Sequence, residues 1–168
     1  MATAIDGINK LLYTREKSQA ETMAGTRLAF QTTHTLSGTA DTNSTSTKDG
    51  TKNTRGTATW TMDAEMLGSD DPTYELLEDA FNAGSLLEFW EVDFNKPGDG
   101  QNEYESKYFQ GVVTDFSNED PSDDNETLSY TVAINGVPQK GTVELEKQEV
   151  DALQYAFTDI KASNNTDD

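Results

Sequence analysis

Polar and apolar residues alternate along two segments that flank a polar stretch between residues 41 and 53. In both segments most apolar side chains fall on even positions, while Thr, Gln and Ser fill the odd ones. This period of two is typical of half-buried strands. The even-numbered set consists of Leu28, Phe30, His34 and Leu36 in the first segment and Ala58, Trp60, Met62, Ala64 and Met66 in the second. The pattern predicts a long hairpin over residues 27–66.

The stretch between these two strands contains no apolar side chain, and its Lys48-Asp49-Gly50 sequence favours a turn. A loop of this length without structure of its own is uncommon in a compact domain, and it is usually disordered or functional. We therefore expect a long polar loop over residues 41–56 that is available to contact a partner.

The clearest helix signal in the chain lies between residues 69 and 84. Asp71 is suited to the N-cap, Pro72 to the first helical position and Gly84 to the position after the last turn. The apolar stripe of this segment consists of Tyr74, Leu77 and Phe81. We expect a helix over residues 71–83 that covers a sheet.

Further strands are predicted from short runs of alternating or apolar residues. They cover residues 10–15, 86–94, 107–116 and 128–134, with a weaker candidate at 141–147. The strand at 86–94 carries apolar residues on both faces, which predicts burial on one face and an interface or a covering helix on the other. Residues 95–106 are expected to form a loop, and residues 117–126 an acidic loop.

These elements predict a mostly β protein with two packed antiparallel sheets, a sandwich or barrel, and one flanking helix. Residues 1–9 are expected to form an N-terminal arm, residues 10–147 the β domain and residues 148–168 a C-terminal extension. Within the extension, residues 150–160 have helix-like spacing and residues 162–168 are expected to fray. The helix-like spacing involves Leu153, Tyr155, Ala156 and Ile160.

Composition narrows the function classes. The 168 residues suit one domain, and 33% of them are hydrophobic. The absence of Cys excludes disulfides, thiolate zinc sites and cysteine nucleophiles. The start of the chain lacks the pattern of a signal peptide, and nowhere do 18 apolar residues run together. We expect a protein that is made in the cytoplasm and has no membrane contact.

The net charge of −19 is unevenly distributed along the chain. Residues 1–59 carry +2, residues 60–126 carry −17 and residues 127–168 carry −4. A surface this acidic repels phosphate, which argues against groove binding to DNA or RNA. Acidity alone also serves solubility. The segregation of charge, however, suits docking of a basic loop carrying Lys48, Lys52 and Arg55 on the acidic body of an identical neighbour.

Catalytic and metal chemistry find little support in the residues. The one histidine, His34, falls on the apolar parity of a strand, which favours a core or interface role. There is no nucleophile elbow, phosphate-binding glycine loop or HExxH motif. Asp93, Asn95 and Asp99 only loosely resemble a calcium loop, and the acidic 117–126 stretch is the other candidate for calcium. We predict no enzyme activity, no catalytic residue, no cofactor and no metal site.

The odd positions of the predicted strands form a polar face without Lys or Arg. In a monomer this face simply meets water. In a ring whose sheets join edge to edge, it becomes the acidic wall of a channel, and the ring removes exposed strand edges. Gln31, Thr33 and Thr35 belong to this polar face on the neighbouring strand. The residues expected to line such a channel are Thr57, Thr59, Thr61, Asp63, Ser129 and Thr131.

Several of these segments resemble those of a known family in their order along the chain and in their local sequence. They are the leader Ala4-Ile-Asp-Gly7, the Thr/Ser-rich hairpin with Lys48-Asp-Gly50, the strand Gly56-Thr-Ala-Thr-Trp-Thr-Met-Asp63 and the helix leading into Leu86-Leu-Glu-Phe-Trp90. Over residues 4–135 the chain resembles the major tail protein of siphophages of the lactococcal TP901-1 type.

The resemblance implies a tail-tube fold in the virion tail, assembled in the host cytoplasm from hexameric rings that stack into a tube. It implies a tape measure protein in the lumen, terminator and distal tail or baseplate proteins at the ends, and DNA that passes without specific binding. It also implies that the long loop contacts the next ring. On that loop we expect the contact residues Asp41, Thr45, Lys48, Asp49, Gly50, Lys52 and Arg55.

Two alternatives stay open at this point. A tail terminator or head–tail connector would share the tube fold. A β-sandwich that binds carbohydrate or another ligand would use Trp60, Trp90 and Tyr104 for stacking, although Trp60 falls on the core parity.

Overall fold

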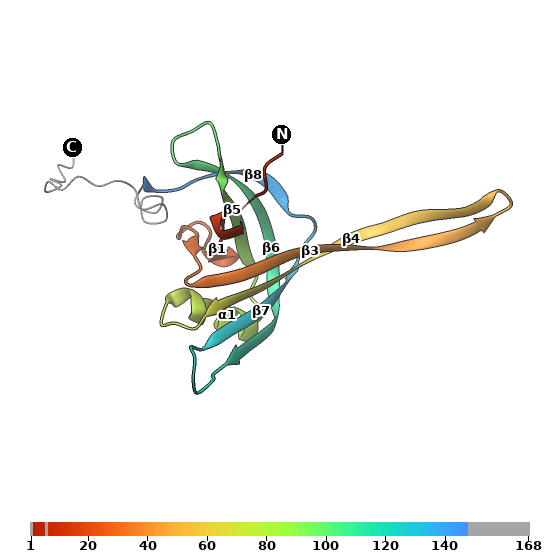
Figure 1. The fold of residues 1–168 in the computed structure, drawn as a ribbon. Helices are drawn as coiled ribbons and strands as arrows, with labels where there is room; N and C mark the ends of the chain where they lie inside the picture. Colours follow the sequence, from red (N-terminus) through yellow and green to blue (C-terminus); the bar gives the residue numbers. More distant parts are fainter. Residues whose placement is uncertain (1, 6, 148–168) are drawn as a thin grey trace, which may run out of the picture.

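A computed structural model describes residues 2–5 and 7–147, which form a curled sheet with one helix and a long projecting hairpin (Figure 1). The predictions for residues 150–160 and 162–168 lie outside the described residues. The strands are β1 (Lys10–Glu16), β2 (Thr26–Arg27), β3 (Gln31–Thr47), β4 (Gly50–Leu67), β5 (Leu87–Pro97), β6 (Glu103–Glu119), β7 (Thr127–Ile134) and β8 (Gln139–Glu144). The helices are α1 (Pro72–Ala83) and the short 3-10 turns η1 (Gly7–Asn9) and η2 (Lys17–Gln19).

The strands form one continuous antiparallel sheet in the order β2-β1-β5-β6-β7-β4-β3, and β8 also pairs with β6. The mostly β class with a single flanking helix is thus confirmed, but two separate sheets are not present in the described chain. The physical reason is the length of β6. Its first half pairs with β5 and β8 and its second half with β7, so one strand joins what would otherwise be two sheets.

Gln31, at the start of β3, brings the two ends of this sheet together. The Leu12 N–H donates to its side-chain oxygen at 2.8 Å, and its amide nitrogen donates to the carbonyl oxygens of Leu12 at 2.9 Å and Leu28 at 2.8 Å. Leu12 belongs to β1, near the other end of the strand order. The amide therefore takes the place of a missing strand pairing and closes the sheet on itself.

The main core lies inside the curl and follows the predicted period of two. The even positions Met62, Ala64 and Met66 of β4 are buried, as predicted. Phe89 and Phe109 stack across β5 and β6 with ring centroids 5.5 Å apart. Fully burying one such side chain stabilises the fold by about 1.5–3 kcal/mol. The other strand residues of this core are Leu12, Leu28, Leu87, Val113, Leu128, Tyr130, Val132 and Ile134.

Helix α1 begins and ends as its sequence predicts. The Asp71 carboxylate accepts a hydrogen bond from the Thr73 N–H at 2.9 Å, and Gly84 has a left-handed φ of 69°. Leu77 and Ala80 are buried against the sheet. Tyr74 donates a hydrogen bond to Glu126, and this bond together with burial raises the pKa of Tyr74 to about 12. The helix is thereby tied to the base of the acidic loop.

Strand ends differ from the predictions where a partner strand continues. The predicted 95–106 loop is shorter, because β5 continues to Pro97 and β6 begins at Glu103. Tyr104 packs on Phe94 there, with ring centroids 4.8 Å apart. β6 also extends to Glu119, into the predicted acidic loop. Such extensions depend on pairing between distant segments, which local patterns do not reveal.

Candidate assembly surfaces

A polar surface, which we call the threonine face, covers the side of β3, β4, β7 and part of β6 that points away from the main core. Asp63 lies between Thr35 of β3 and Thr131 of β7, and the Thr131 hydroxyl donates to its carboxylate at 2.7 Å. The register places Ser129 between Glu65 and Ser117. The face consists of Thr33, Thr35, Ser37, Thr39, Thr59, Thr61, Asp63, Glu65, Asp115, Ser117, Ser129, Thr131 and Ala133.

The charge of the threonine face is entirely acidic. Its ionisable members are Asp63, Glu65 and Asp115, and none of its members is Lys or Arg. A shallow hollow of about 260 Å³ lies over the pairing of β4 with β7. Without Lys or Arg, the face has no array of cations that could hold phosphates.

Five of the six residues predicted to line a channel lie together on this face. Thr59, Thr61 and Asp63 alternate along β4, while Ser129 and Thr131 alternate along β7. The sixth, Thr57, lies in a register irregularity of β4 and is exposed. The prediction that Gln31 shares this polar face is wrong, because a register shift follows it and its side chain bonds to the backbone of Leu12 and Leu28 instead. The sequence therefore predicts the common face correctly, but the irregularity at its edge could not be predicted from alternation alone.

The second surface is the arm, which we define as residues 39–59. Among the described strands, β3 and β4 pair only with each other over this stretch, because β7 joins β4 from Trp60 onward. Figure 1 shows this ribbon projecting far from the rest of the molecule. At about 3.4 Å per residue, the nine residues 39–47 alone span about 30 Å. Between Asp41 and Arg55, toward the tip, the two-stranded ribbon is exposed on both faces.

The predicted 41–56 loop is therefore wrong in its conformation. Residues 42–47 and 50–55 form a regular ladder that ends in a two-residue turn at Lys48 and Asp49. Hydrogen bonds within the arm support it, including one from the Ser44 hydroxyl to Asn53 at 2.6 Å and one from the Thr47 hydroxyl to the Gly50 carbonyl at 2.6 Å. Thr is a good strand residue even without apolar neighbours, so a polar sequence here does not mean absence of structure.

All the predicted contact residues lie on the arm. Thr45 is directly opposite Lys52, and the turn residues Lys48 and Asp49 occupy its tip. A bulge near Gly56 shifts the register, so that Arg55 pairs with Thr42. As directly opposed residues share a face, Lys52 lies on one face of the arm and Arg55 on the other. The basic side chains therefore surround the ribbon.

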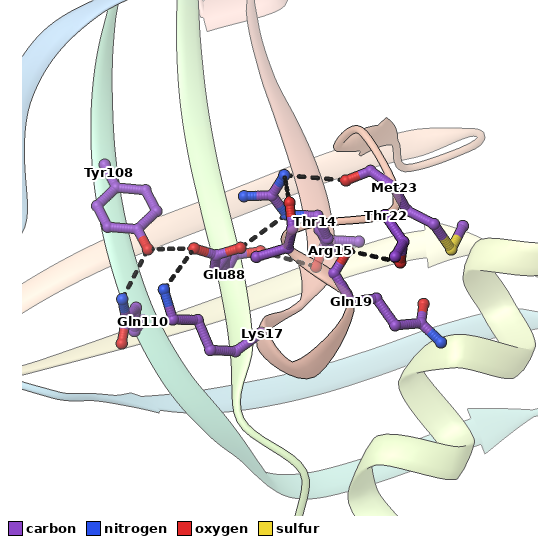
Figure 2. Close-up of polar contacts among 10 residues, drawn as sticks. Thr14, Arg15, Lys17, Gln19, Thr22, Met23, Glu88, Tyr108 and Gln110 are labelled. Carbon is purple, nitrogen blue, oxygen red and sulfur yellow. Dashed lines mark hydrogen bonds and ion pairs between the residues drawn. The ribbon is translucent and has the colours of Figure 1, made fainter.

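Figure 2 shows a network of polar contacts around the buried Glu88. This network was not predicted from the sequence. Glu88 is 3% exposed and accepts hydrogen bonds from Arg15 at 2.7 Å, Lys17 at 3.3 Å and the Tyr108 hydroxyl at 2.5 Å. Burial alone would raise the pKa of Glu88, but these hydrogen bonds outweigh it and hold the pKa below its ordinary value. The signal that could have revealed this network is the acidic residue in the middle of an apolar strand.

Arg15 extends the network to the segment that follows η2. Its guanidinium also donates to the carbonyl oxygens of Ala20 at 3.2 Å and Met23 at 2.9 Å. Figure 2 shows the bond from Arg15 of β1 to Met23, which holds the segment after η2 against this strand. The network therefore fixes the sheet face opposite the main core.

His34 is partly buried and lies 2.9 Å from a carboxylate oxygen of Glu91. This contact joins β3 to β5 across the inside of the curl. The hydrogen bond with His34 outweighs burial and holds the pKa of Glu91 below its ordinary value. The arrangement gives His34 a polar partner, as expected for a histidine in a core or interface role.

Within residues 2–5 and 7–147, no group of three or more His, Cys, Asp and Glu side chains is placed to hold a metal ion. The same residues include no helix long and apolar enough to cross a membrane.

Comparisons with known proteins agree on one family. The family model described as phage tail tube protein matches residues 4–140. A protein named as a tail protein in Staphylococcus phage phiMR25 is 32% identical over 150 residues, which cover 85% of this chain and 77% of that protein.

Solved structures show the same fold at low identity. The SPP1 tail tube matches with a TM-score of 0.73 and 15% identity, over 96% of this chain and 88% of that one. The tail of an empty gene transfer agent particle, refined with helical and C6 symmetry, matches with a TM-score of 0.64 and 14% identity, over 81% of this chain and 98% of that one.

Proposed function

The chain belongs to the phage tail tube protein family, which makes it a structural component of the virion tail, and we propose that it builds the tube as stacked hexameric rings. The tube serves as a conduit for DNA, and the role is structural rather than catalytic. The six-fold symmetry of the gene transfer agent tail supports the ring size. The lactococcal TP901-1 subtype stays a prediction.

The observation that carries the proposal is the arm. A two-stranded ribbon is marginally stable alone in water, and no third strand or core from residues 2–5 and 7–147 lies beneath the arm. A surface held out so far from the domain gains most by docking on a second copy. Contact between different surfaces of identical subunits is heterologous, and where its geometry does not close into a ring, as between stacked rings, it generates a filament along the stacking direction.

The threonine face supplies the wall of the conduit in this proposal. Its charged residues Asp63, Glu65 and Asp115 repel phosphate at the wall. Lys and Arg hold DNA because they displace counterions from its phosphates. The wall has neither residue, so DNA passes without being held.

We propose further partners on the same basis. An open filament needs proteins that set its length and cap its ends. These are the tape measure protein in the lumen, the tail terminator at one end and the distal tail or baseplate proteins at the other, as the family resemblance implies.

Shortening the arm tests the stacking contact. Replacing residues 43–54 with Asn-Gly joins the Thr42–Arg55 pair through a two-residue turn of the kind that hairpins favour. We expect a folded protein with the melting temperature of the wild type that no longer forms tubes in electron micrographs. Normal tubes from this variant would overturn the role of the arm.

Basic substitutions on the threonine face test the lumen assignment. A phage carrying Thr61→Lys and Asp63→Lys should assemble tails of normal length but deliver DNA poorly, because the new cations hold phosphates. The matched control, Thr142→Lys with Glu144→Lys, makes the same change in charge at two exposed positions of β8, off this face. Unimpaired infectivity of the double variant, with intact tails, would contradict the assignment.

A further inference from the structure

Lysine side chains gather near the start of β6, at the end of the sheet where β8 pairs with it. A hollow of about 460 Å³ lies there over β5, β6 and β8. Four of the 12 Lys and Arg residues of the chain line it, in a protein of net charge −19. We call this surface the lysine hollow, and its cations are Lys10, Lys96, Lys107 and Lys140. Its carboxylates are those of Glu91, Asp93 and Glu105.

Two of these lysines, Lys107 of β6 and Lys140 of β8, are directly opposite each other in the register. Directly opposed side chains share a face, and like charges in such a pair are destabilising. Lys107 is also opposite Glu91 of β5. The Glu91 carboxylate, however, already lies 2.9 Å from His34 and 4.0 Å from the Lys10 ammonium. Among the described residues, neither Lys107 nor Lys140 forms an ion pair.

The other two carboxylates of the hollow are engaged elsewhere. Glu105 pairs with Lys96 at 3.8 Å. Asp93 accepts a hydrogen bond from the Asn95 N–H at 3.0 Å and is opposite Lys10 of β1. The hollow therefore holds one cation more than it has carboxylates, and the opposed lysine pair is where a further carboxylate would offset repulsion.

The acidic loop between β6 and β7, residues 117–126, is the complementary surface. It carries five carboxylates and no Lys or Arg. Among the described residues, none of these carboxylates forms an ion pair. The loop is held at its base, because the Gly68 N–H donates to the Glu126 carbonyl at 2.8 Å and Tyr74 donates to the Glu126 carboxylate. The exposed acidic residues are Glu119, Asp120, Asp123 and Asp124.

The lysine hollow and the acidic loop lie at opposite ends of β6. β8 pairs with the start of this strand, and the turn into β7 follows its other end (Figure 1). At about 3.4 Å per residue, the stretch from Lys107 to Glu119 spans about 40 Å. The acidic loop therefore does not reach the hollow of its own chain. Complementary surfaces at opposite ends of one subunit are suited to a head-to-tail contact between identical copies.

We propose that the acidic loop of one copy docks in the lysine hollow of a second copy, where an exposed carboxylate bridges Lys107 and Lys140. The contact replaces repulsion between two ammonium groups with charge-assisted hydrogen bonds, which are roughly twice as strong as neutral ones. This inference rests on the proposed self-assembly and adds to it a contact that does not involve the arm.

Cysteine crosslinking tests this contact, because the chain contains no native Cys. Full-length protein carrying Asp124→Cys is assembled together with protein carrying Lys140→Cys, both at exposed positions, and treated with a short bismaleimide. We expect a crosslinked dimer that contains one chain of each variant. In the matched control, Glu78→Cys at an exposed position of α1 replaces Asp124→Cys and should give far less dimer.

The crosslinks and the tubes are scored separately. Tubes without the crosslinked dimer would overturn this inference and leave the proposed function intact. A crosslinked dimer from protein that forms no tubes would support the contact and contradict the proposed function.

Charge exchange tests whether the contact is electrostatic. Lys107→Glu with Lys140→Glu should slow assembly at low salt about tenfold or more, and so should Asp123→Lys with Asp124→Lys. Combining all four substitutions should restore the rate, because the two surfaces then exchange charge. Circular dichroism checks that each variant retains its strands, and Lys140→Glu alone gives a milder test at an exposed position.

The matched control combines the two reversed lysines with Glu78→Lys and Asp79→Lys on α1. It changes the net charge as the four-fold exchange does, but it leaves the acidic loop unaltered, so the rate should stay low. Equal recovery in the control would reduce the effect to net charge and contradict the contact. Normal assembly of the variant with reversed loop residues would assign the hollow to another anion and overturn the proposal.

Discussion

Glu88 illustrates at the scale of single residues how this fold keeps a carboxylate ionised beneath its surface. The side chain is 3% exposed, yet Arg15, Lys17 and Tyr108 each donate to it. Removing one partner of a buried, hydrogen-bonded charge costs more than the pair contributes, because the remaining charge is left without its partner.

Replacing Glu88 with Gln should lower the free energy of unfolding by about 2 kcal/mol at pH 7. Its pKa in the folded protein lies below the ordinary value of 4.5, so the ionised carboxylate stabilises the fold above that value. The contribution is lost as the pH falls through the lower folded pKa. Urea unfolding at pH 7 and pH 3 should therefore show a difference that shrinks in acid, with the exposed Glu75→Gln as the control. An equal loss at both pH values would contradict this.

Gly111 marks a place where two strands approach closely. A Cβ atom there would lie 2.4 Å from the carbonyl oxygen of Ala133 on β7. Gly111→Ala should therefore destabilise the protein by about 1–3 kcal/mol or more through overpacking. Gly141 has open space around it and no positive φ, so Gly141→Ala serves as the control. Equal melting temperatures for the two variants would be the contrary result.

At the scale of elements, closure of the sheet depends on the Gln31 side chain. Gln31→Leu removes its three hydrogen bonds and leaves the Leu12 N–H without this acceptor. We expect a loss of about 2 kcal/mol in chemical unfolding. Thr33→Leu, at an exposed position of the same strand, should cost much less. Unchanged stability of the Gln31 variant would show that the amide does not hold the sheet closed.

Alternation predicted the proximal half of β4 well because one face of that strand is buried. In β3 the even positions His34 and Leu36 are only partly buried, and Phe30, predicted on the same parity, lies before the strand and is exposed. The period identified Met62, Met66 and the threonines of the opposite face. In the distal part of β4, from Gly50 to Arg55, both faces are exposed, so no apolar pattern distinguishes strand from loop. The arm is a ribbon because β3 pairs with β4 and because Thr favours strands. Neither cause leaves an alternation of polar and apolar residues, so the sequence pattern did not predict the ribbon.

The single sheet escaped prediction for a related reason. Whether β6 pairs with β7, β8 or both depends on contacts between residues far apart in the sequence. Helix α1 was predicted almost to the residue, because its signals at Asp71, Pro72 and Gly84 are local. The Glu88 network was missed because its partners come from β1, η2 and β6, which only the folded chain brings together.

At the scale of the whole molecule, charge is segregated between the arm and the body. Residues 41–56 carry three basic and two acidic side chains in a protein of net charge −19. Lys52→Glu and Lys147→Glu change the net charge equally, but only Lys52 lies on the arm. We expect slower tube assembly for Lys52→Glu alone, measured by light scattering at low salt, with the difference reduced at high salt by screening. Equal rates for the two variants would remove the electrostatic role of the arm.

The most direct test of the central claim is cryo-electron microscopy of the purified full-length protein with helical reconstruction. The proposal predicts tubes built from rings of six copies, with the arm of each subunit resting on a subunit of the adjacent ring. It also predicts the threonine face, with Asp63 and Asp115, along the lumen. A persistent monomer, a single capped ring, or tubes with the threonine face on the outside would contradict it.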